Sequence, residues 1–301
     1  MKTFYSNGKL LLTSEYLVLD GALALAIPTK FGQSLTVKNL ANHEIIWKSH
    51  DHQGTIWFEG RFSISQNNIK HVTSSDIEIS NRLLQILNAA KKLNVSFLNT
   101  GFEVTTTLNF QKNWGLGTSS TLINNIAQWA QIDPYKLLGL TFGGSGFDVA
   151  CAQNNTPITY QLNNSIRLVN LIDFNPPFKS HLYFVYLNRK QNSRESIASY
   201  KQKMTSQDAI EKASRLTQNI IQAKDLKTFC NLIEAHEILI SNLLNINPIK
   251  QMLFPNFKGS IKSLGGWGGD FILAVSQDNP MSYFESKGFK TVIPYSEMVL
   301  K

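Results

Sequence analysis

The sequence predicts an α+β protein of two domains, and three observations support that fold class. The first hundred residues are mostly short apolar runs between turn residues, which is typical of strands. The second half alternates strand-like runs with amphipathic helical segments. The chain has 301 residues, 43% of them hydrophobic, which is enough for two cores. We expect domains at residues 1–175 and 176–301, because Pro176 and Pro177 precede a new apolar strand.

The first half is expected to begin with strands at "KLLL", "ALALAI", "SLTV", "EIIW" and "TIWFEGRFSI". "HDHQG" near residue 52 predicts a hairpin turn between the last two. Its His50 and His52 are metal-ligand types, but without further ligands a solvated turn is favoured. Residues 76–93 predict an amphipathic helix. Its apolar face consists of Ile79, Leu83, Ile86, Leu87 and Ala90. The strand "GFEVTTTL" follows.

The segment "WGLGTSSTLINNIAQWA", residues 114–130, places glycines and hydroxyl residues directly before a helix. The helical spacing of its apolar residues predicts one buried face. Thr118 or Ser119 is expected to cap the helix. Gly115 and Gly117 leave the backbone free to curl, so N–H donors gather at the positive end of the helix dipole, which suits a phosphate. The alternative is an ordinary capped helix after a glycine turn.

The remaining elements alternate between helices and strands. "DPYKLLGL" predicts a helix capped by Asp133 with Pro134 at its first position. The strand "HLYFVYL" precedes helices at about 208–223 and 225–245, and "SIKSLGGWGGDFILAVS" predicts a strand, a glycine turn and a strand. A last helix and "KTVIPY" close the chain. "LNRKQNSRES" brings Arg189, Lys190 and Arg194 together after a strand, either as a ligand site or as a solvated basic loop.

Composition narrows the functional classes. Lys and Arg exceed Asp and Glu by 29 to 21, a formal net charge of +8, which favours small anionic partners. The cations are scattered without interleaved aromatics, so no nucleic-acid groove is expected. No apolar run approaches the ~20 residues of a membrane helix, and Cys151 and Cys230 suggest neither a metal site nor a disulfide framework. A cytoplasmic monomer or homodimer that does not bind membranes is the simplest interpretation.

Four special sites occur in order along the chain, and together they resemble the motifs of a known superfamily. The quoted stretches are "GKLLLTSEYLVLDG", "GLGTSST", "GSGFDVA" and "KSLGGWGGDF". Each alone has an ordinary structural explanation. In this order and at this spacing, they resemble the motifs of the GHMP kinases, the superfamily of galactokinase, homoserine kinase, mevalonate kinase and phosphomevalonate kinase. "LIEAHEILISNL" is similar to the family's His-bearing helix, with His236 in that place.

The resemblance implies a fold and a set of site residues. It implies an N-terminal ATP-binding domain and a ferredoxin-like C-terminal domain. Asp148 is expected to be the catalytic base, with Lys9 beside it, and Ser119 to contact Mg²⁺ through its hydroxyl. The residues expected to bind ATP are Gly115, Leu116, Gly117, Thr118, Ser119 and Ser120. Those expected to bind substrate are Glu15, Lys190, Arg194, Gly266 and His236.

Some positions depart from the family pattern, and the acceptor stays open. Between Glu103 and Asp148 the only acidic residue is Asp133, so a second protein ligand for Mg²⁺ is not evident. Trp114 and Trp267 are bulky where the family keeps small residues, and core packing is favoured for both. The resemblance is to the mevalonate and phosphomevalonate kinase branch. Alternatives are a diphosphomevalonate decarboxylase-like enzyme and a non-catalytic metabolite sensor.

Overall fold

The computed structural model describes residues 1–66, 68–164, 166–191, 193–202 and 205–300, with only the backbone for 193–195. Two compact units make up this part of the chain. The first unit comprises Met1–Gly8, Phe31–Lys112 and Leu116–Gln153, and the second comprises Lys9–Lys30, Asn113–Gly115 and Asn154–Lys301. Because these are contact units, the expected domain division after residue 175 stays a prediction.

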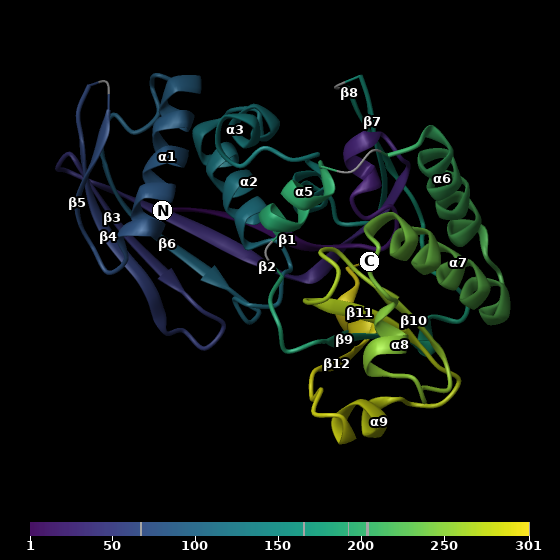
Figure 1. Ribbon diagram of the computed structural model, residues 1–301. Coiled ribbons are helices and arrows are strands. Elements are labelled where there is room, and N and C mark those ends of the chain that lie inside the picture. Colours follow the sequence, from purple (N-terminus) through teal and green to yellow (C-terminus); the bar gives the residue numbers. More distant parts are fainter. Residues whose placement is uncertain (67, 165, 192, 203–204, 301) are drawn as a thin grey trace. The chain divides into compact units, whose positions relative to one another are not determined.

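In the described residues of the first unit, three strands are followed by a helix, a further strand and three helices (Figure 1). They are β3 (Glu44–His50), β4 (Ile56–Ile64), β5 (Ile69–Ser74), α1 (Ile77–Leu93), β6 (Gly101–Leu108), α2 (Thr118–Ala130), α3 (Pro134–Thr141) and α4 (Phe147–Gln153). Strands β1 (Lys2–Leu11) and β2 (Ala24–Leu40) pair with each other, and each contributes residues to both units.

The sheet of the first unit has the order β5-β4-β3-β6-β2. Strands β3 and β6 are parallel and the other neighbours are antiparallel. Alternate residues of β3 are buried, as the period of a strand requires. The predicted turn between β3 and β4 is confirmed, because Asp51 N–H donates to Thr55 O at 2.9 Å.

Helix α1 covers the buried face of this sheet (Figure 1). Asp76 caps it by accepting hydrogen bonds from the N–H groups of Glu78 and Ile79, so the predicted helix at 76–93 is confirmed. Asp133 likewise caps α3, with Pro134 at its first position. The core between helices and sheet includes Trp47, Phe58, Phe62, Leu83, Ile86, Leu87, Val104, Ile123 and Ile126.

The second unit contains a longer series of elements (Figure 1). They are β7 (Ile158–Asn163), β8 (Ile166–Leu171), β9 (Leu182–Tyr186), α5 (Ser193–Tyr200), α6 (Gln207–Gln222), α7 (Leu226–Leu244), α8 (Ile249–Leu253), β10 (Ser260–Ser263), β11 (Phe271–Val275), α9 (Met281–Ser286), β12 (Val292–Pro294) and α10 (Tyr295–Met298). Strand β7 pairs with β8 and with the first residues of β2.

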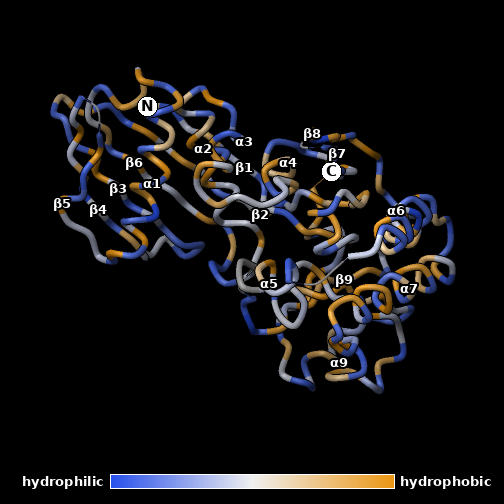
Figure 2. The backbone as a smooth tube through the Cα atoms, turned by 45° about the horizontal axis from the view of Figure 1, so that its top comes forward, coloured by the Kyte–Doolittle hydropathy of each residue, from blue (hydrophilic) through white to orange (hydrophobic). Residues whose placement is uncertain are grey.

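Strands β9 to β12 form an antiparallel sheet of order β10-β11-β9-β12. Helices connect β9 to β10 and β11 to β12, which is the split βαβ arrangement of a ferredoxin-like fold. The expected ferredoxin-like part is therefore present. Its core includes Val185, Phe254, Ile261, Ile272 and Phe284. Figure 2 shows hydrophobic and hydrophilic residues on α6, whose buried positions are Ala213, Thr217 and Ile220.

Two strands, β5 and β8, were not predicted, for a common reason. Strand β5 buries only Ile69, and the six residues of β8 are exposed or half-buried. A strand with no buried face leaves no alternating pattern to recognise. Among the described residues, no helix is long and apolar enough to cross a membrane.

Candidate active site

Two left-handed glycines precede helix α2. Gly115 has φ 69° and Gly117 has φ 94°, values that side chains rarely adopt. Gly117 is the N-cap, and no side chain caps the helix. The expected cap by Thr118 or Ser119 is therefore wrong. The Ser120 and Thr121 hydroxyls donate instead to Gly117 O, at 2.9 and 3.1 Å. The N-cap Gly117 therefore offers no side-chain oxygen to the first-turn N–H groups, which is the arrangement that receives an anion.

The side chains of the loop differ in accessibility. Ser119 is exposed, Thr118 is half-buried, and Ser120 and Leu116 are buried. Of the four hydroxyl residues at the start of α2, Thr118 to Thr121, Ser119 is therefore the most exposed to a ligand. Leu116 anchors the loop in the interior of the first unit.

Asp148 lies in the same unit as Leu116–Ser120. It is the second residue of α4 and is half-buried, and its Oδ1 accepts a hydrogen bond from Val149 N–H at 3.0 Å. Because Asp148 lies inside α4, it is not the N-cap residue of this helix. The catalytic role of Asp148 stays a prediction, as does its pairing with Lys9, which belongs to the second unit.

Lys9 meets the first loop glycine within the second unit. Its Nζ donates to Gly115 O at 3.0 Å. Beside them lies Asp270, which follows the glycines of "KSLGGWGGDF" but is not among the predicted site residues. Asp270 is 8% exposed, and burial raises the pKa of its carboxyl against the opposing effects of the Gln191 N–H, Lys9 and Lys190. The sequence feature that could have identified Asp270 is its position as a charged residue directly after a glycine turn.

The glycines between β10 and β11 serve two purposes. A Cβ at Gly266 would lie 2.8 Å from Gln191 Cγ, and one at Gly269 would lie 2.7 Å from Arg189 O. These two positions accommodate the chain after β9. Gly265 and Gly268 are left-handed, with φ 62° and 91°, and face open space. The binding of substrate by Gly266 stays a prediction.

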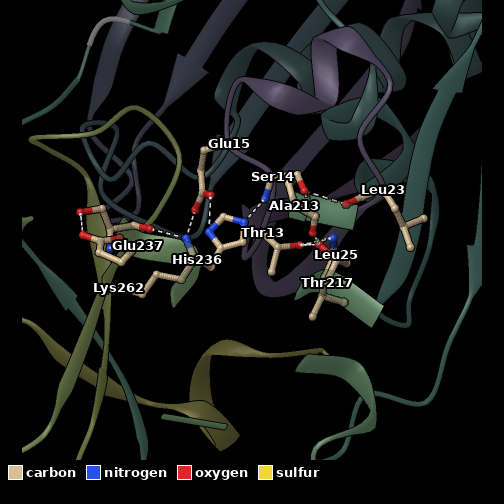
Figure 3. Close-up of polar contacts among 11 residues, drawn as sticks. Thr13, Ser14, Glu15, Leu23, Leu25, Ala213, Thr217, His236, Glu237 and Lys262 are labelled. Carbon is tan, nitrogen blue, oxygen red and sulfur yellow. Dashed lines mark hydrogen bonds and ion pairs between the residues drawn. The ribbon is translucent and has the colours of Figure 1, made fainter. Parts of the chain in front are cut away.

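A group of ionisable residues lies buried in the second unit (Figure 3). Lys262 Nζ donates to Glu15 Oε1, and His236 Nδ1 lies 3.7 Å from Glu15 Oε2. His236 Nε2 accepts from Ser14 N–H at 2.8 Å, so a neutral imidazole carries its proton on Nδ1, towards Glu15. Glu237 accepts from Ser263 Oγ and N–H. The residues come from the turn after β1, from α7 and from β10.

Burial controls the protonation of this group. Desolvation raises the pKa of Glu15 to about 7, although Lys262 favours its ionised form. Desolvation also raises the pKa of Glu237 and, with Lys262, lowers the pKa of His236 well below its usual value. Direct binding of a substrate by Glu15 or His236 requires solvent access, which neither has in this structure. Their substrate role stays a prediction.

The remaining predicted site residues follow β9. Lys190 is exposed and belongs to the second unit. Arg194 lies on α5, but its side chain is outside the described residues. The described residues contain no group of three or more His, Cys, Asp or Glu side chains that could hold a metal ion. Mg²⁺ commonly takes few protein ligands beside substrate phosphates, so an exposed Ser119 hydroxyl fits it as a single ligand.

Comparison with known proteins gives a match to solved structures alone. No family model and no curated protein matches the chain. The mevalonate kinase of Methanococcus jannaschii matches with a TM-score of 0.70 at 14% identity, over 97% of this chain and 96% of that one. The chain has the fold of the GHMP kinases.

Other structures with the GHMP-kinase fold are named for different acceptors. Streptococcus pneumoniae phosphomevalonate kinase, in complex with phosphomevalonate and AMPPNP, has a TM-score of 0.68 at 14% identity, over 100% of this chain and 98% of that one. Lactococcus lactis galactokinase, complexed with galactose, has a TM-score of 0.67 at 12% identity, over 95% and 88%. The fold is therefore common to enzymes of several substrates and does not choose among them.

Proposed function

We propose that this protein is an ATP-dependent kinase that transfers the γ-phosphoryl group of ATP to a hydroxyl of a small metabolite. The observation that carries the proposal is the uncapped N-terminus of α2 after the left-handed Gly115 and Gly117. The GHMP-kinase fold supports it, and a matching structure holds AMPPNP.

The proposed roles follow from what phosphoryl transfer needs, which is alignment and charge neutralisation. The N–H groups of residues 117–120 bind the phosphates, and the Ser119 hydroxyl is a ligand for Mg²⁺, which when bound neutralises charge on the phosphates. Asp148 accepts the proton of the acceptor hydroxyl. Lys9 keeps that carboxylate ionised.

We propose phosphomevalonate or mevalonate as the acceptor and the cytoplasm as the location. Two matching structures, a mevalonate kinase and a phosphomevalonate kinase, support this choice of acceptor. Lys190 favours the phosphorylated acceptor, because it is an exposed cation at the end of β9. The cytoplasmic location is supported by the sequence, which has only two cysteines.

The test is a panel of acceptors with Mg²⁺ and ATP, in which ADP and CO₂ are both followed. Release of ADP with phosphorylated acceptor and no CO₂ supports the kinase. Equal release of ADP and CO₂ from diphosphomevalonate identifies a decarboxylase instead. Ligand binding without ADP release across the panel supports a sensor and overturns the proposal.

A further inference from the structure

The segment Asn113–Gly115, which opens the glycine loop, is held to the second unit at three consecutive residues. Tyr186 OH donates to Asn113 O at 3.0 Å. The Trp114 ring packs edge-on against Phe271, with centroids 5.6 Å apart. Lys9 Nζ donates to Gly115 O. The main-chain carbonyls on either side of Trp114 are therefore both fixed by side chains.

Asp270 completes this attachment from the side of the glycine turn. Its carboxyl group occupies the space that a Cβ on Gly115 would need. The carboxyl is itself held, because Oδ1 accepts a hydrogen bond from Gln191 N–H at 3.1 Å. The Asp270 backbone is held too, since its N–H donates to Arg189 O at 2.7 Å and its carbonyl accepts from Leu187 N–H at 2.8 Å.

The conformation of Asp270 shows how firmly it is placed. Its φ of 52° is unusual for a residue with a side chain and persists only where the surroundings determine it. The carboxyl is buried beside two cations, Lys9 and Lys190, that favour its ionised form. The carboxyl group therefore blocks movement of Gly115, the residue whose carbonyl oxygen Lys9 holds.

We infer that Asp270 is a positioning residue of the phosphate loop, acting through Gly115, an inference that rests on the proposed nucleotide-binding function. Gly115 is two residues before Gly117, the N-cap of α2. Only Leu116 separates them, and it is fully buried. A displacement of Gly115 therefore reaches the N–H groups of the α2 N-terminus with little chain to absorb it.

The experiment is a double-mutant cycle with Gly115→Ala and Asp270→Gly. Glycine suits the left-handed position 270, so Asp270→Gly removes the carboxyl without adding backbone strain. Alone, Asp270→Gly is expected to weaken nucleotide binding about 10-fold and to raise KM for ATP more than KM for the acceptor. Gly115→Ala is expected to weaken nucleotide binding further than Asp270→Gly does, because its methyl group overlaps the Asp270 carboxyl.

The double variant is the decisive member of the cycle. Removal of the carboxyl makes room for the methyl group that Gly115→Ala introduces. The Kd of the double variant for nucleotide should therefore be at least about 10-fold lower than the value obtained by multiplying the Kd increases of the two single variants. Asp278→Gly is the matched control, because Asp278 is exposed in the same unit. It should leave binding unchanged.

Trp114 fluorescence provides a second measurement that needs no nucleotide. Subtracting the spectrum of the corresponding Trp114→Phe variant isolates Trp114 from the other tryptophans. Asp270→Gly should shift the Trp114 emission and Asp278→Gly should not, because the former loosens the segment that carries this ring.

The outcomes separate the inference from the proposed function. A wild-type protein that binds no nucleotide overturns the function whatever the variants do. A wild-type protein that binds nucleotide, with Asp270→Gly equal to Asp278→Gly and with additive effects in the cycle, overturns the inference and leaves the function standing.

Discussion

At the level of single residues, the buried carboxylate of Glu15 is the most consequential group of the second unit. It is fully buried and pairs with Lys262, also fully buried, while His236 lies 3.7 Å from its other oxygen. Removing one member of a buried ion pair leaves an uncompensated charge and costs roughly 3–5 kcal/mol. The group therefore constrains how the turn after β1, α7 and β10 come together.

Glu15 should make stability depend on pH. Its pKa rises from 4.5 to about 7 on folding, so the folded protein binds this proton more tightly. The stabilisation is complete below pH 4.5 and is lost as pH rises through about 7. The stability of wild type relative to Glu15→Gln should fall by about 3 kcal/mol across that window, measured by denaturant unfolding at several pH values.

The comparison with Glu15→Gln isolates this carboxyl. Glu237 has a raised pKa and acts in the same direction, whereas His236 has a lowered pKa and acts in the opposite one. Both are present in both proteins, so their own titrations largely cancel, and the difference reports the titration of Glu15 together with its coupling to these two neighbours. Glu285→Gln, at an exposed position of α9, is the control and should show no such slope. A pH-independent difference for Glu15→Gln would contradict the prediction.

Asp148→Asn should lower kcat by roughly 10²–10⁴-fold, the usual effect of losing a general base. Affinity for ATP should be nearly unchanged, because the amide keeps the shape of the side chain. Steady-state kinetics and nucleotide titration measure the two effects. Asp133→Asn is the matched control, since asparagine also caps a helix and α3 should stay intact. Near-normal turnover of Asp148→Asn removes Asp148 from the proposed role.

At the level of helices and strands, the N-terminus of α2 contrasts with those of α1 and α3. Asp76 and Asp133 cap their helices with a carboxylate, whereas α2 begins at a glycine with no capping side chain. A helix that omits its cap keeps its N–H groups for another acceptor, and its dipole favours a negative one. The difference between neighbouring helices is what distinguishes α2 as the candidate phosphate site.

Gly117→Val should abolish nucleotide binding. The N-cap has φ 94°, which a β-branched residue does not adopt without strain, so the loop should rearrange. Titration with ATP measures the loss. Gly139→Val is the matched control, because Gly139 lies within α3 and a Cβ there meets open space. If Gly117→Val folds and binds ATP normally, the phosphate does not lie at this loop.

At the level of the complete chain, the excess of positive charge is relevant to the identity of the acceptor substrate. The formal net charge of +8 raises the local concentration of anions, but it does not distinguish ATP from a phosphorylated acceptor. Specific cations must make that distinction. Lys190 and Arg194 are the candidates, since they follow the strand β9 in sequence.

Replacing Lys190 and Arg194 by glutamine should raise KM for a phosphorylated acceptor about 10-fold and leave KM for ATP unchanged. The reason is the loss of charge-assisted hydrogen bonds to the acceptor phosphate. The control replaces Arg215 and Lys287, both exposed, by glutamine and makes the same change in net charge. Equal effects of both pairs would show that net charge alone is responsible. Efficient use of mevalonate, indifferent to both pairs, favours mevalonate kinase.

Local elements and the order of the motifs could be predicted from the amino-acid sequence alone. Asp76 and Asp133 indicate the starts of α1 and α3, and the apolar rhythm indicates α2, because capping and periodicity are properties of neighbouring residues. The glycines before α2 predicted a flexible turn for the same reason. The ferredoxin-like arrangement came from the resemblance of the motifs.

Contacts between distant residues required the three-dimensional structure. Glu15 and Lys262 are 247 positions apart, and Asp270 packs on Gly115 although the two are far apart in the sequence as well. No local pattern encodes such contacts, because they depend on how the whole chain folds back on itself. Burial is of the same kind: Glu15 and His236, which the motifs gave as expected substrate-binding residues, lie in the interior of the second unit, because accessibility depends on how the whole chain packs and not on a residue's place in the sequence.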